Sequence, residues 1–285
     1  MLLSAKNIVN KSIELLKRDF RVWLPYLIAM VASALLSSLF GFNPTFVLFF
    51  NTFGIPSSMV WMLSAMTLLL LSIFNIWLNL VLVRTVHERI FDQKSTGLIE
   101  KFRQTRHLLA RNIGIVVLFF TLVSAPFVIG FSGFTLVWFE NAILGQISGV
   151  TALYLLFAFA LLVLYGIIHF AYFSVRYAFS YYLVAIDEKK ITEGLHQGNF
   201  LTEGRRGKIF WRMAFPGVVF LLIYVLATNI LGAVSVALNN TFFTSFAGFI
   251  SLLVSAVSLL LINISMVILF EDVKVKPLSV SPPKD

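Results

Sequence analysis

The chain alternates between long apolar blocks and shorter segments that carry almost all of its charge. Residues 22–83, 112–175 and 213–270 form blocks of 62, 64 and 58 residues, and Glu140 is the single charged residue within them. A helix needs roughly 20 apolar residues to cross the hydrocarbon of a bilayer. Each block is therefore too long for one span and has the length of two spans joined by a turn.

Candidate turns lie near the middle of each block. Gly, Pro and Asn, which commonly interrupt regular structure, cluster within residues 41–56, 130–141 and 239–241. These breaks predict spans near 22–40, 58–83, 112–136, 148–175, 214–238 and 245–270. The runs lack the alternation of a membrane barrel, so the chain is predicted to be an all-α integral membrane protein with six transmembrane helices arranged as three hairpins.

Composition supports a lipid environment. Apolar residues make up 59% of the 285 residues, charged residues make up 12%, and 30 residues are Phe. An ordinary soluble domain carries about a quarter charged residues. A chain this apolar could not cover its surface with polar groups as a soluble monomer.

The basic residues predict an orientation. The chain has 22 Lys and Arg and a formal net charge of +9, and these residues lie before residue 22, in 84–111, in 176–212 or after 270. Because Lys and Arg are retained on the cytoplasmic side, we expect a multi-pass protein of the cell membrane with both termini in the cytoplasm. Such a net charge could also suit nucleic acid, but its position between apolar blocks predicts no nucleic-acid partner.

The three blocks resemble copies of one unit. Each has a basic first segment, a span with one proline (Pro25, Pro126 or Pro216), a Phe-rich outer turn and a proline-free span. We expect one membrane domain over 1–270, with repeat units of about 1–92, 93–186 and 187–270, and a flexible cytoplasmic tail over 271–285. Repeats of this kind would be related by a pseudo-threefold axis along the membrane normal. Alternatively, any three membrane hairpins would look alike.

The Phe-rich turns cover Phe46–Phe50, Phe134–Phe139 and Phe242–Phe246. Aromatic side chains favour the membrane interface, so the turns could dip back into it. They could instead form an apolar patch for a partner or a lipid.

An amphipathic helix is predicted before each hairpin. In the first, Ile8, Val9, Ile13, Leu16 and Phe20 share one face, and Lys6, Lys11, Glu14, Lys17 and Arg18 share the other; residues 98–111 repeat the pattern, with Lys101 on the polar side. This pattern suits a helix on the inner membrane surface, with its apolar side down and its basic side toward anionic headgroups. The same helix could also bind a partner protein.

The third basic segment carries a recognisable pattern. Arg176-Tyr177-Ala178-Phe179 leads to Val184-Ala185-Ile186-Asp187, then to Ile191-Thr192-Glu193-Gly194-Leu195 and Glu203-Gly204-Arg205-Arg206-Gly207. It resembles the membrane domain of glycerophosphodiester phosphodiesterases and related six-span bacterial and archaeal proteins. Gly194 and Gly198 stand where that family tends to have Ala and Ser. In fused members the chemistry belongs to a separate soluble barrel, whose acid and histidine motifs are missing from this sequence, so the resemblance does not imply that activity.

Catalytic patterns are not found. The chain has no Cys, and His87-Glu88 lacks the second His that a zinc-protease helix needs, so it is interpreted as a solvated helix end. No catalytic residue, cofactor or metal is predicted. A candidate polar pocket within the spans is formed by Tyr165, His169, Tyr172, Asn75 and Asn79. The alternative is that these groups serve helix packing through interhelical hydrogen bonds.

The preferred functional hypothesis is a non-enzymatic protein that interacts with lipid or serves as a membrane scaffold. Its partners would be membrane lipids with anionic headgroups on the cytoplasmic side, and the candidate contacts are Arg205, Arg206, Lys208, Lys17 and Arg18. The alternative is a transporter or channel for a lipid-like or uncharged substrate, through a cavity between hairpins.

Overall fold

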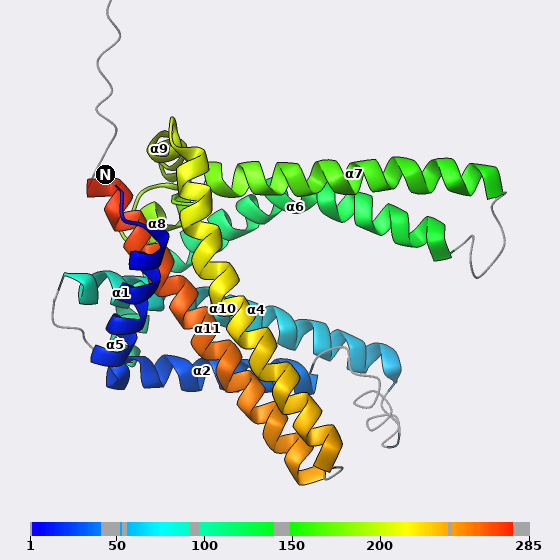
Figure 1. Cartoon of the computed structure of the whole chain (residues 1–285), viewed down its shortest axis with the longest axis horizontal. Helices are drawn as coiled ribbons and strands as arrows, with labels where there is room; N and C mark the ends of the chain where they lie inside the picture. Colours follow the sequence, from blue (N-terminus) through cyan, green and yellow to red (C-terminus); the bar gives the residue numbers. More distant parts are fainter. Residues whose placement is uncertain are drawn as a thin grey trace, which may run out of the picture. The chain divides into compact units, whose positions relative to one another are not determined.

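The computed structural model describes residues 2–40, 52, 56–91, 97–139, 149–238 and 241–275, and all regular structure in these residues is helical (Figure 1). The helices are, in chain order, α1 (Ala5–Arg18), α2 (Phe20–Phe40), α4 (Ser57–Ile90), α5 (Leu98–Thr105), the 3-10 turn η1 (Arg106–Leu108), α6 (Leu109–Phe139), α7 (Gly149–Arg176), α8 (Ser180–Ala185), α9 (Ile191–Thr202), α10 (Arg206–Leu238) and α11 (Thr241–Val275).

Six helices in this part of the chain are long and apolar enough to cross a membrane, as predicted. Helices α2, α4, α6, α7, α10 and α11 each contain one predicted span, apart from residue 148, which lies outside the described residues. The helices extend past the charge-free blocks: α4 continues to Ile90 and α10 begins at Arg206. The spans therefore carry charged residues directly on their helical ends.

The helices form two compact units. Unit 1 comprises Met1–Asn112 and Phe210–Asp285, and unit 2 comprises Ile113–Ile209. The boundaries between the units lie near the start of α6 and near the start of α10. They do not coincide with the limits of the expected repeat units, and the threefold repeat stays a prediction.

In unit 1, helix α1 packs Val9 and Ser12 against other helices of the unit. Val9 forms a buried cluster with Phe220 of α10 and Leu261 of α11. The Ser12 and Ser265 hydroxyl groups form a buried hydrogen bond of 2.8 Å between α1 and α11. The apolar side of this helix thus belongs to the protein core, which differs from the expected burial of that side in lipid.

In unit 2, glycines bring α6 and α7 into close contact. A Cβ atom on Gly166 would lie 2.6 Å from the Cα of Phe127, and one on Gly130 would lie 2.8 Å from the main-chain nitrogen of Val163. The prediction that Gly130 to Gly133 mark a break between spans is wrong, because α6 continues through them to Phe139. These glycines provide room for the facing helix.

The structure contradicts two further predictions, which concern the Phe-rich turns and the C-terminal tail. Phe134–Phe139 and Phe242–Phe246 are helical residues of α6 and α11 rather than turns, and residues 46–50 lie outside the described residues. Residues 271–275 form the last turn of α11 rather than a tail, because Glu271 and Asp272 bind other parts of unit 1. The rest of the expected tail, residues 276–285, lies outside the described residues.

Glycine also explains how α8 and α9 fit together. A Cβ atom on Gly198 would lie 2.3 Å from the hydroxyl oxygen of Ser180 and 3.0 Å from its main-chain nitrogen. Despite the low helix propensity of glycine, α9 is continuous from Ile191 to Thr202. The close approach of α8 requires a residue without a side chain at this position.

Candidate functional site

His169 forms a hydrogen bond inside the α6–α7 pair. Its Nε2 lies 2.9 Å from the carbonyl oxygen of Leu122 and donates to it. In an uninterrupted helix this carbonyl would accept from the N–H of residue 126, but Pro126 has no N–H. His169 therefore supplies the donor that the proline removes from the neighbouring helix.

The other residues of the predicted pocket lie in different surroundings. Tyr165 is 55% exposed and its ring centroid lies 5.7 Å from that of His169, while the Tyr172 hydroxyl accepts a 2.8 Å hydrogen bond from Arg206. Asn75 and Asn79 belong to α4 in unit 1, whereas the three α7 residues belong to unit 2. None of the five lines the cavity described below. The observed contact of His169 supports the packing interpretation.

A double-mutant cycle tests this role of His169. We expect His169→Ala to lower the free energy of unfolding by about 1 kcal/mol, since it leaves a carbonyl in apolar surroundings without a donor. In a Pro126→Ala background the cost should fall close to zero, because residue 126 then donates to Leu122 itself. Unfolding in mixed detergent micelles measures both costs, and equal costs in the two backgrounds would contradict the assignment.

Three consecutive residues at the end of α4 join it to three other helices of unit 1. His87 Nδ1 lies 3.0 Å from a carboxylate oxygen of Glu271 on α11, Glu88 pairs with Lys101 on α5, and the Arg89 carbonyl accepts a 3.0 Å hydrogen bond from Arg18 on α1. The interpretation of this segment as a solvated helix end is wrong. Sequence spacing could not reveal these contacts, because each partner lies on another helix.

The prediction that Lys101 lies on a polar helix face is also wrong. Its side chain is 3% exposed, and it pairs with Glu88, so it does not belong to a solvated basic face. Its helix is short, and Trp77 of α4 donates a 3.1 Å hydrogen bond to Thr105 at the helix end. Helix α5 is thus held against α4 by both of these contacts.

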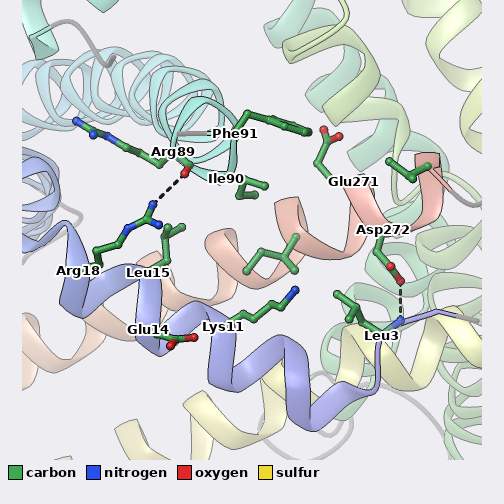
Figure 2. A pocket seen from close by; sticks show the side chains of 12 residues that line it. Leu3, Lys11, Glu14, Leu15, Arg18, Arg89, Ile90, Phe91, Glu271 and Asp272 are labelled. Carbon is green, nitrogen blue, oxygen red and sulfur yellow. Dashed lines mark hydrogen bonds between the residues drawn. The ribbon is translucent and has the colours of Figure 1, made fainter. Parts of the chain in front are cut away.

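A cavity of about 560 Å³ opens beside this junction, between α1, the end of α4 and the end of α11 (Figure 2). Its charged lining consists of three basic side chains and three carboxylates: Lys11, Arg18, Arg89, Glu14, Glu271 and Asp272. Asp272 accepts a 2.7 Å hydrogen bond from the Leu3 N–H, and Arg18 reaches the Arg89 carbonyl. The remaining lining is apolar, including Phe91 and Ile268. This balance of charge does not favour an anionic ligand over a zwitterionic one.

A different charge pattern occurs in unit 2, where two arginines meet at one amide. Arg176 Nε and Arg206 Nη2 donate to the same Asn199 side-chain oxygen over 2.9 Å and 3.0 Å. The Arg206 guanidinium lies over the ring of Tyr172 at 5.2 Å, and that of Arg176 lies over Tyr177 at 5.3 Å. Two like charges that share one neutral acceptor repel each other. This cluster is therefore suited to an anion.

The five predicted headgroup contacts differ in their surroundings. Arg18 forms an ion pair of 3.2 Å with Asp19, and Lys17 is exposed on α1. Lys208 is exposed and Arg205 half-buried near the start of α10, and both have partners. Arg206 is held by Asn199 and Tyr172. Of the three side chains that meet here, the sequence predicts Arg206 as a ligand contact but not Arg176 or Asn199.

Among the described residues, no group of three or more His, Asp or Glu side chains could hold a metal ion. Comparisons with models of protein families, with curated proteins and with solved structures found no match.

Proposed function

We propose that this chain is a non-enzymatic multi-pass protein of the cell membrane that binds anionic lipid headgroups at the basic ends of its helices. The observation that carries the proposal is the contrast between helix middles and helix ends. On α7 the large apolar side chains are more than half exposed at Leu153, Phe157, Leu161, Leu164 and Ile168. Contiguous apolar surface of this kind suits lipid rather than water.

The finer arrangement follows from contacts between neighbouring helices. We infer three hairpins, α2–α4, α6–α7 and α10–α11. The Tyr26–Thr85 hydrogen bond of 2.6 Å supports the first, the close approach of Gly166 to Phe127 the second, and the buried cluster that Phe220 and Leu261 share with Val9 the third. Both termini would lie in the cytoplasm, since Lys and Arg flank the hairpins on one side. The amphipathic segments, the threefold repeat and the resemblance to the glycerophosphodiester phosphodiesterase membrane domain belong to the same proposal.

Transport of a lipid-like or uncharged substrate is the alternative function. It would need Tyr165, His169 and Tyr172 of α7 to line a path for the substrate, yet His169 forms a hydrogen bond with the Leu122 carbonyl. The lipid-binding proposal has the stronger support, because the exposed apolar surface and the basic helix ends both agree with it.

The proposal predicts a preference for anionic lipid. Protein in nanodiscs of phosphatidylcholine with phosphatidylglycerol should unfold at a higher temperature than protein in phosphatidylcholine alone. Ligand at about 100 times its Kd stabilises the folded state by about 3 kcal/mol, and the gain should shrink at high salt because exposed charges are screened. Thermal unfolding followed by tryptophan fluorescence measures the difference, and equal stability in the two nanodiscs would refute anionic-lipid binding.

A further inference from the structure

The arginine cluster of unit 2, defined as Arg176, Asn199, Arg206 and Tyr172, has positive charge without a carboxylate. The hydrogen-bond partners of the two guanidinium groups within the described residues are the neutral Asn199 and Tyr172 side chains. Neither arginine forms an ion pair in this part of the chain, although ion pairs are present at Arg18 and Lys101. The charges are thus oriented by the protein and left uncompensated by it.

Several donors of the cluster remain available. Arg176 donates to Asn199 through Nε. Its two terminal nitrogen atoms have no hydrogen-bond partner among the described residues. The Nε of Arg206 is buried and also has no partner there. A buried donor without an acceptor costs free energy, and guanidinium groups bind phosphate oxygens through paired N–H donors. The available N–H donors and the positive charge of the two arginines therefore favour an oxyanion as ligand.

The framework around the cluster is rigid. Tyr172 and Phe173 lie one turn before the end of α7, and the Arg176 guanidinium lies over Phe173 at 5.6 Å and over Tyr177 at 5.3 Å. Thr202 donates a 3.2 Å hydrogen bond to the Arg176 carbonyl, which fixes the end of α7 to α9. Arg206 is the first residue of the long helix α10, whose positive end adds to the field. Preorganised cations bind without the entropy cost of ordering long side chains.

We propose that Arg176 and Arg206 jointly bind one phosphate group, and that this group belongs to the headgroup of an anionic phospholipid. The phosphate chemistry rests on the arginine cluster itself, and the lipid source rests on the proposed function. The position fits such a source, since both arginines stand where an apolar helix meets its polar end. Asn199 binds both guanidinium groups through a neutral oxygen, so their charge remains available to the ligand.

Asn199→Asp is the sharpest test, because it keeps an oxygen acceptor between the arginines and adds the missing negative charge. It should preserve or raise the melting temperature while weakening phosphate binding by at least about tenfold, the effect of losing one charge-assisted interaction. Arg176→Gln with Arg206→Gln should weaken binding at least as much. Lys190→Gln, which removes an exposed charge at the N-cap of α9, more than two helical turns before Asn199, is the control and should leave binding unchanged.

Three probes separate the possible sources. Phosphatidic acid in phosphatidylcholine nanodiscs supplies a lipid phosphate, oleate in the same nanodiscs supplies an anionic lipid without phosphate, and inorganic phosphate is added to protein in detergent. Lipid retained by each variant is measured by native mass spectrometry, and phosphate binding by calorimetry. Retention of phosphatidic acid over oleate, lost in Asn199→Asp, supports the proposal.

The contrary outcomes are distinct. If wild type prefers both anionic lipids equally and Asn199→Asp changes nothing, the arginine cluster is not the site while anionic-lipid binding stands. If wild type binds inorganic phosphate but not phosphatidic acid, the lipid source is overturned. If no probe binds wild type, both the site and the proposed function fail.

Discussion

Replacing Gly166 with alanine should lower the free energy of unfolding by about 1–3 kcal/mol, the usual cost of overpacking a close contact. The new Cβ would lie 2.6 Å from the Cα of Phe127 and 2.7 Å from its main-chain nitrogen. Main-chain atoms cannot rotate away as the end of a side chain can, so α6 and α7 must move apart. Separation would also lengthen the hydrogen bond from His169 to Leu122, on the same pair of helices.

Gly232→Ala on α10 provides the matched control. A Cβ there has no neighbour within 4 Å, so the substitution should gain up to about 1 kcal/mol from the better helix propensity of alanine. Unfolding of both variants in mixed micelles with increasing dodecyl sulfate gives the comparison. A gain in stability for Gly166→Ala, like the gain expected for Gly232→Ala, would show that α6 and α7 do not approach as closely as the structure indicates.

The number and position of the long helices could be predicted from the sequence because lipid imposes a simple rule. A charge-free run must satisfy its backbone internally, and a helix does this over roughly 20 residues. Blocks of 58 to 64 residues consequently predict two helices each. The ends of these helices are harder to predict, because a helix can continue from lipid into water. Helices α4 and α10 both include charged residues beyond the apolar blocks.

The clearest wrong prediction is the turn at Gly130 and Gly133. Gly130 and Gly133 suggested a turn, but both lie within α6, where a side chain would overlap α7. Glycine is favoured in turns for its backbone freedom and in helix contacts for its small size. The sequence alone does not separate these roles. Pro126 and His169, however, could have indicated the contact between α6 and α7. Pro126 leaves the Leu122 carbonyl without its usual main-chain donor, and a histidine on the neighbouring helix can supply one.

The polar sites depended on contacts between distant segments. Lys101 has the sequence surroundings of a solvated residue, yet it is buried beside Glu88, which lies before it on another helix. Arg176 and Arg206 were both visible as basic residues near helix ends. Their shared partner Asn199 lies on a short helix between them, and only folding shows that the three side chains meet.

Glu88→Ala should destabilise the protein by about 2–4 kcal/mol, and Lys101→Met by less than about 1.5 kcal/mol. Removing one partner of a buried ion pair costs up to about 3–5 kcal/mol because the other charge stays buried. After Glu88→Ala the Lys101 ammonium, 3% exposed, would lack its counter-charge, and Arg84 and Arg89 would add repulsion. After Lys101→Met the buried volume stays filled, and the Glu88 carboxylate, 26% exposed, remains in contact with water.

The double variant distinguishes the ion pair from simple loss of packing. If the cost of Glu88→Ala comes from the stranded ammonium, Glu88→Ala with Lys101→Met should be more stable than Glu88→Ala alone. If it comes from lost contacts of Glu88, the two costs should add, as they do for independent sites. Unfolding in mixed micelles measures all three variants. The expected order follows from one physical asymmetry, since the lysine is the partner that water cannot reach.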